Sequence, residues 1–174
     1  VEVAGLTVGI IGAVTAETPA LVSPGGVANL EFGDPVEAVN RVATLLSDGV
    51  DTVENPEADV LVAQYHEGAN VSTSLADALA ASAVFTSIVE DTHPEVDAIF
   101  NGNTHATYAF SASVGEGTRP VVQTGSYGAN IGEVVLTVDN ATGDVVAHTQ
   151  RNVARTSVAN DTLVATYPRV AAVK

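Results

Sequence analysis

Short apolar runs and amphipathic stretches alternate along the first hundred residues of the chain. The runs Leu6–Val14, Val60–Ala63 and Asp97–Phe100 predict buried strands, because each is apolar over most of its length and bounded by turn residues. Val1–Val3 predicts a further short strand that meets the first run at a turn around Gly5. Continuous apolar strands are typical of sheets that are covered on both faces.

Two amphipathic stretches lie between these strands and predict helices. The first begins at Asp34, which can cap the helix, because Pro35 suits the first helical position and Glu37 completes a capping-box spacing. Gly49 ends it. The second, rich in Ala, is expected over Ser74–Val89. The residues expected to face the core are Val36, Val39, Ala43 and Leu46 in the first helix, and Leu75, Leu79, Phe85, Ile88 and Val89 in the second.

The order strand, helix, strand, helix, strand predicts parallel βαβαβ units, and the second half of the chain has a different character. Its expected strands follow one another without helices, which indicates mainly antiparallel pairing: Thr107–Ala112, Pro120–Thr124, Glu133–Asp139 and Val145–Arg155. Asn140–Gly143 is expected to form the hairpin turn between the last two. The remaining stretches are Thr15–Asn29, expected as a surface loop, the acidic loop Asp51–Glu57, and Asp161–Val173, which is too mixed to assign.

Composition narrows the possible functions. The length of 174 residues fits one domain, and with no Cys any metal would be held by His, carboxylate, amide or water. The net charge of -15 argues against nucleic acid and anionic membranes as partners. We find no apolar run long enough to span a membrane and no signal-peptide pattern. The chain opens directly on a strand, from which we expect a fragment of a longer domain.

Candidate chemistry is concentrated where the apolar strands end. His66 follows the second strand, and Asn103 and His105 follow the third through an Asn-Gly-Asn turn. Open α/β sheets usually bind ligands past the carboxyl ends of their strands, so these side chains are candidate ligands. The alternative is that each histidine is satisfied by nearby backbone groups. We expect His93 to be a solvated loop residue and His148 a surface strand residue.

Motifs of other catalytic classes are missing from the sequence. No Ser lies in a Gly-x-Ser-x-Gly elbow, and the glycines form neither a Walker loop nor a dinucleotide-binding fingerprint. The carboxylate pairs Glu90-Asp91 and Asp51 with Glu54 are interpreted as solvated charge. Nucleophilic serine catalysis and Rossmann-type binding therefore have no support.

Five segments of the sequence resemble segments of a known family. Asp59–Gly68 is similar to the strand-Ser-His-x-Gly motif of the 5′-nucleotidases, and Asp97–His105 resembles their Gly-His-Thr-His motif. Pro120–Gly128 is close to their Pro-Val-Val-Gln-Ala-Gly-Ser-Tyr-Gly. Gly9–Gly12 and Phe32–Pro35 fit their middle segment. This family comprises secreted calcineurin-like metallophosphoesterases, including UDP-sugar hydrolases and 2′,3′-cyclic-nucleotide phosphodiesterases.

The resemblance implies fold, chemistry and ligands. The fold would be part of a four-layer α/β/β/α sandwich. The activity would be hydrolysis of nucleotides or sugar nucleotides by a water activated between two divalent metals, with Zn or Mn favoured. By position in the motifs, His66 and Asn103 would bind one metal and His105 the other. The location would be secreted, periplasmic or cell-wall associated.

Two departures from the family pattern limit this expectation. The upstream Asp-x-His, Gly-Asp and Gly-Asn-His motifs and the nucleoside-binding C-terminal domain are absent, so residues 1–174 would be the C-terminal part of a metallophosphoesterase domain. Asn103 stands where the family has His, and either binds metal weakly or relaxes a tight turn. The alternative function is a noncatalytic binding or structural module. As partners we expect the missing N-terminal half or a second copy of the chain.

Overall fold

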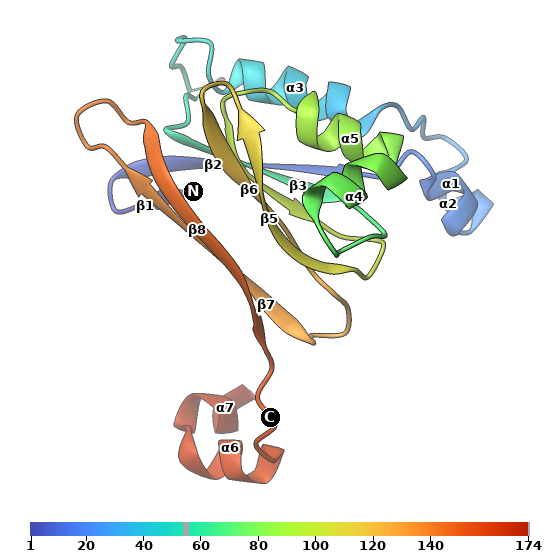
Figure 1. Ribbon diagram of the computed structural model, residues 1–174, viewed down its shortest axis with the longest axis vertical. Coiled ribbons are helices and arrows are strands. Elements are labelled where there is room, and N and C mark those ends of the chain that lie inside the picture. The colour runs from blue at the N-terminus through green and yellow to red at the C-terminus, as the bar shows by residue number, and fades with distance from the viewer. Residues whose placement is uncertain (54–55, 174) are drawn as a thin grey trace.

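The computed structural model describes residues 1–53 and 56–173, which form a mixed α/β fold (Figure 1). Its strands are β1 (Glu2–Val3), β2 (Leu6–Val14), β3 (Val60–His66), β4 (Val96–Asn101), β5 (Thr107–Val114), β6 (Gly117–Thr124), β7 (Asn130–Val138) and β8 (Val145–Ala154). Its helices are α1 (Thr18–Leu21), α2 (Pro24–Val27), α3 (Pro35–Leu45), α4 (Leu75–Ala81), α5 (Ala83–Glu90), α6 (Asn160–Thr166) and α7 (Pro168–Val173). None of the helices in these ranges has the length and apolarity that a transmembrane span requires.

The main sheet has six strands in the order β1-β2-β3-β4-β6-β5. β2, β3, β4 and β6 run parallel to one another, whereas β1 and β5 pair antiparallel at the two edges. The predicted βαβαβ order is confirmed, because α3 connects β2 to β3 and α4 with α5 connects β3 to β4. The carboxyl ends of the parallel strands therefore lie side by side along one edge of the sheet, the edge that runs across the strands.

Helices α3, α4 and α5 cover one face of this sheet (Figure 1). The Asp34 carboxylate caps α3 by accepting hydrogen bonds from the amides of Val36 and Glu37, as the sequence predicted. The predicted inward face of α3 is confirmed for its first three residues, and Leu46 is half-buried beside them. The core between helices and sheet contains Val36, Val39, Ala43, Phe85, Ile88 and Val89 from the helices, with Ile11, Leu61, Ala63, Tyr65, Ile99 and Val121 from the strands.

The hairpin β7–β8 lies against the other face of the main sheet, over β5 and β6. A Cβ at Gly132 of β7 would lie 2.9 Å from Thr124 Cγ2 and 3.1 Å from Val122 Cγ1, so the two sheets approach closely here. The observed layers are helices, main sheet and hairpin. Within the residues that the structure describes, no fourth layer of helices covers the hairpin, so the predicted four-layer sandwich is not seen in full.

Several elements differ from the sequence prediction. The helix expected over 74–89 is two helices, because Ser82 adopts an extended backbone and its hydroxyl accepts a hydrogen bond from the Phe85 amide, capping α5. The loop expected over 15–29 contains α1 and α2, each with a proline in its first turn. The unassigned end of the chain forms α6 and α7, which lie apart from the sheets in Figure 1. Part of the predicted acidic loop, residues 54–55, falls outside the described residues.

Candidate active site

The strands that end in His66 and Asn101 are neighbours, as the sequence predicted. In the parallel register Val14 of β2 pairs with His66 of β3, and Tyr65 pairs with Asn101 of β4. His66 is exposed at this edge, and its imidazole lies so near the next turn that a Cβ at Gly102 would stand 3.2 Å from His66 Nδ1. A glycine at this place lets the turn after β4 approach the imidazole.

The turn after β4 has a strained backbone. Asn103 has φ +68°, and the Thr104 amide donates to the Gly102 carbonyl at 2.8 Å, which closes a three-residue γ-turn of the less common hand. His105 also has a positive φ of +62°. Each such residue costs about 1–3 kcal/mol, and this strain is most often retained near functional sites. The turn interpretation of Asn103 is therefore observed, whereas its role as a metal ligand stays a prediction.

His105 lies toward β6. The Gly125 amide, just past the end of β6, donates to the Ala106 carbonyl at 2.8 Å, which fastens the segment after His105 to that strand end. The imidazole of His105 meets the ring of Tyr127 edge to face, with ring centroids 5.7 Å apart. His66 thus lies against the turn after β4, and His105 lies beside the segment after β6.

A closed set of hydrogen bonds joins these strand ends. The Ala69 amide donates to the Tyr108 hydroxyl (3.2 Å), which donates to Gln123 Oε1 (3.1 Å). Gln123 Nε2 donates to the Thr104 hydroxyl (2.7 Å), which donates back to the Ala69 carbonyl (2.7 Å). Asn101 Nδ2 adds a bond to the Glu67 carbonyl at 2.8 Å. The loop after β3 and the loop after β4 are therefore held together through β5 and β6.

Burial makes this set of bonds rigid. Tyr108 and Gln123 are both buried, and desolvation raises the pKa of the Tyr108 phenol well above its ordinary value, so it stays a hydrogen-bond donor. A Cβ at Gly68 would overlap Gln123 Oε1 and come within 2.8 Å of the Tyr108 hydroxyl. Only glycine fits at this position, and the close contact of Gly68 with Gln123 holds the loop after His66 against β6.

A hollow of 370 Å³ opens on the sheet face beside His66, lined by residues 12–14, 64–66 and 100–102. No Lys or Arg occurs in the sequence at 64–68, 101–105 or 124–130, so these strand-end segments carry no cationic side chain of their own. Two imidazoles and an amide would suit a divalent cation as part of its ligand set. Within residues 1–53 and 56–173, no three His, Asp or Glu side chains converge to hold a metal by themselves.

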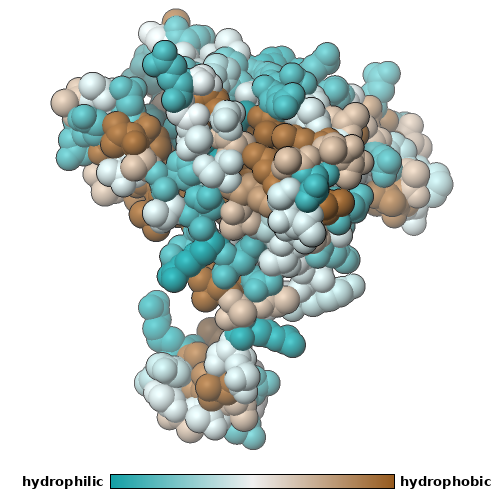
Figure 2. All heavy atoms as spheres, in the orientation of Figure 1, coloured by the Kyte–Doolittle hydropathy of each residue, from teal (hydrophilic) through white to brown (hydrophobic). Residues whose placement is uncertain are grey.

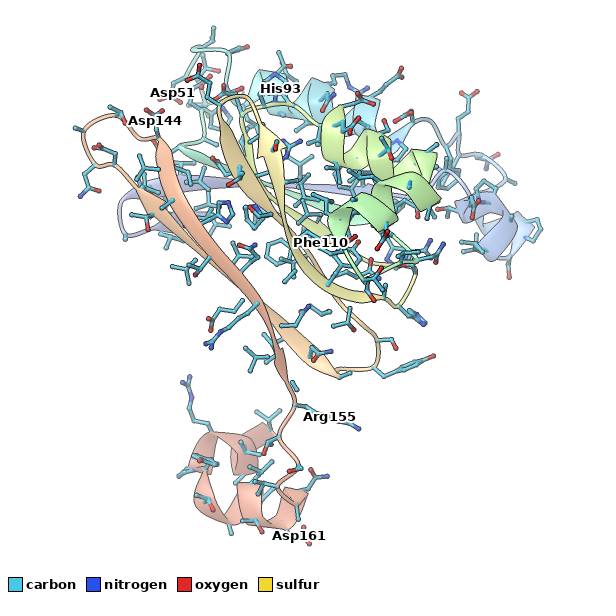
Figure 3. The ribbon with its side chains drawn as sticks, viewed as in Figure 1. Asp51, His93, Phe110, Asp144, Arg155 and Asp161 are labelled. Carbon is cyan, nitrogen blue, oxygen red and sulfur yellow. The ribbon has the colours of Figure 1, made fainter. Side chains whose placement is uncertain are left out.

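The other two histidines lie elsewhere. His93 precedes β4 and lies at the opposite edge of the sheet, at the top of the view in Figure 3, where its ring accepts a hydrogen bond from the Glu95 amide. His148 is half-buried on β8, with its ring between the Thr118 hydroxyl and Gln150 Oε1. His148 therefore lies on a strand as expected, half-buried, and its ring contacts Thr118 of the main sheet.

Sequence reasoning assigned no role to Tyr108 or Gln123. A glutamine inside the apolar run Pro120–Thr124 is the signal that could have drawn attention to β6, because a buried amide needs hydrogen-bond partners. The identity of those partners depends on tertiary structure. A larger hollow of 620 Å³ lies between α6 and α7, where Figure 2 shows apolar residues in the lower lobe, away from the strand ends.

Comparison with known proteins gives distant similarities. No family model matches the chain. Endonuclease YhcR of Bacillus subtilis (strain 168) is 29% identical over 147 residues, which are 84% of this chain and 11% of that protein. A crystal structure of a hypothetical protein from Thermus thermophilus has a TM-score of 0.48 and 14% identity over 90% of this chain and 61% of that chain. The chain therefore spans about a tenth of the length of the curated relative and less than two thirds of the solved structure.

Proposed function

We propose that residues 1–174 are the C-terminal part of a divalent-metal-dependent phosphoesterase domain that hydrolyses nucleotides or sugar nucleotides. The observation that carries the proposal is the contact of His66 with the turn at Gly102, at the carboxyl ends of adjacent parallel strands. The similarity to a protein named an endonuclease supports a hydrolase, because endonucleases also cleave phosphate esters. The resemblance to secreted 5′-nucleotidases adds an extracytoplasmic location to the proposal.

The proposed roles follow from the donor atoms. His66 and Asn103 would hold one metal and His105 a second, of the Zn or Mn type. Such a pair lowers the pKa of a bound water and offsets the charge of the phosphoryl oxygens. The chain's own contribution is to orient these donors, through the bonds between Thr104, Gln123 and Ala69. The segments 64–68, 101–105 and 124–130 carry no basic side chain, so the metals would supply the positive charge within them.

A noncatalytic module is the second candidate function. It is favoured by Asn103 in place of His and by the lack of a three-ligand group within the described residues. Two imidazoles and one amide cannot hold two metals, so we expect the 174-residue chain alone to release no phosphate from a nucleoside monophosphate with Zn or Mn. Robust release by the purified chain would contradict this expectation.

The two candidates differ in the full-length gene product. It should hydrolyse adenosine 5′-monophosphate or UDP-glucose with added Mn, and His66→Ala should reduce the rate by at least about a hundredfold, as loss of a metal ligand or its support does. His93→Ala, at the other edge of the sheet, is the matched control and should retain the rate. If His66→Ala hydrolyses both substrates at the native rate, His66 has no catalytic role, and the noncatalytic module becomes the better candidate. Cleavage of single-stranded DNA in place of both nucleotides would move the proposal to a nuclease.

The uncovered part of the main sheet suggests a partner. Beyond β7–β8, Ile10 and Val14 of β2 are 53% and 51% exposed on the same face as His66. Exposed apolar residues in a group favour association. We propose that the missing N-terminal half of the domain covers this face, or a second copy of the chain does so when that half is absent. A strictly monomeric chain by light scattering at high concentration would contradict the second statement.

A further inference from the structure

The connection between β6 and β7 is a tight turn with an unusual residue in it. The Ala129 amide donates to the Ser126 carbonyl at 3.0 Å, and the two central residues, Tyr127 and Gly128, have φ +54° and +67°. Positive φ at both central positions is the geometry of a type I′ turn. Asn-Gly is the preferred pair for that turn, because Asn tolerates left-handed backbone and most other residues do not.

Tyr127 is an unfavourable residue for this position, and contacts within the chain do not offset its cost. Its side chain is 91% exposed, so its ring buries almost no apolar surface within the chain. The ring's one aromatic neighbour within the described residues is His105, at 5.7 Å and an interplanar angle of 63°. The turn therefore holds an aromatic ring in solvent, directly beside a proposed metal ligand.

The geometry points to Tyr127 as the contact for the planar group of a phosphate ester whose phosphoryl end lies at His105. The inference rests on the proposed function and adds a specificity-determining residue to it: Tyr127 would favour esters whose alcohol carries an aromatic or heteroaromatic ring over esters of aliphatic alcohols. An exposed ring on a fixed turn offers a flat face for stacking at little cost in conformational freedom. The ester end would meet the imidazole, and the ring end would meet the phenol.

The first arm of the test asks whether Tyr127 serves the fold. In the 174-residue chain, Tyr127→Asn supplies the residue that the turn prefers, so its melting temperature should equal or exceed that of the native chain. A fall of more than about 4 °C, which is a substantial loss of stability for a domain of this size, would show that Tyr127 stabilises the fold and would overturn the inference.

The second arm measures substrate preference in the full-length gene product with Mn. Tyr127→Leu should lower kcat/KM for adenosine 5′-monophosphate by at least about fivefold, the lower end of base–aromatic stacking, and leave glycerol 2-phosphate unchanged. Tyr127→Phe should restore the native preference. Tyr167→Leu, which alters another exposed tyrosine remote from the site, is the control.

The outcomes separate this inference from the proposed function. A native protein that hydrolyses neither ester refutes the proposed function, and the inference falls with it. A native protein that hydrolyses both, with Tyr127→Leu unchanged or reduced equally for the two, refutes the inference alone. Equal reduction would indicate that Tyr127 packs against another part of the full-length protein.

Discussion

Arg119 is a buried cation, and replacing it tests how α5 is fastened to the sheet. Its side chain is 2% exposed. The guanidinium donates to the carbonyls of Val89 (2.9 Å), Thr92 (3.0 Å), His93 (2.9 Å) and Val96 (3.3 Å), where α5 ends and β4 begins. Cationic donors suit the carboxyl end of a helix. Burial lowers the pKa of Arg119 to about 10, so it stays charged at neutral pH.

The expected loss of stability can be estimated from the carbonyls that accept hydrogen bonds from the guanidinium. In Arg119→Met the His93 carbonyl keeps its bond from the Val96 amide, and the other three carbonyls lose the guanidinium donor. At about 1 kcal/mol each, the loss is about 3 kcal/mol, or a melting temperature lower by about 6–12 °C. Removing a buried charge can stabilise a protein when its partners are replaced as well. A substitution cannot replace backbone carbonyls, so we expect the loss of these hydrogen bonds to outweigh the gain from removing the buried charge.

The assay is urea and thermal unfolding of the purified chain followed by circular dichroism. Arg119→Lys keeps the charge but not the planar fork, and should fall between the native chain and Arg119→Met. Arg151→Met is the matched control, because Arg151 pairs with Glu133 on an exposed strand face and should unfold at nearly the native midpoint. Native or higher stability of Arg119→Met would refute the reasoning.

Three further changes test the site and the strand pairing. Gly68→Ala should destabilise the chain, since the added methyl overlaps Gln123 Oε1, whereas Gly12→Ala, with open space around it, should not; equal unfolding midpoints would contradict this. Desolvation raises the pKa of Asp97 from 3.8 to about 6. The contribution of Asp97 to stability is therefore fully present below pH 3.8 and is lost as the pH rises through about 6. Asp97→Asn should therefore gain stability relative to the native chain between about pH 4 and pH 7, and a difference independent of pH would exclude that cause. In the full-length protein Asn103→His should tighten Zn binding several-fold by calorimetry, and unchanged affinity would leave Asn103 as a turn residue only.

The parallel half of the fold could be predicted because its signals are local. The apolar run that ends at His66 and the cap at Asp34 each depend on a few consecutive residues. The break at Ser82 was missed, because serine is compatible with a helix interior and its preference for the cap is decided by the burial of Phe85. A second sheet layer was expected only from the family resemblance, since alternation along β7 and β8 fixes which side of a strand is apolar but not which sheet it meets.

The candidate site was predictable to the same degree. That His66 and Asn101 end adjacent strands follows from the βαβ order. The bonds through Tyr108 and Gln123 join residues distant in sequence, and no spacing rule indicates them. Arg119 shows the same limit, because all of its partners are backbone carbonyls, which any residue carries.

The exposed apolar face of the sheet and the proposed metal site lie in the same region of the molecule. Ile10, Val14 and His66 lie on one face of β2 and β3, and the 370 Å³ hollow opens between that face and the turn after β4. Val14 and His66 both line this hollow, so a segment that packs over Val14 would lie beside His66. Burying that apolar surface would stabilise the fold, and the same contact would bring further ligands to the imidazoles. Under the proposed function, covering this face would also complete the metal set, which is why we expect the isolated chain to be inactive.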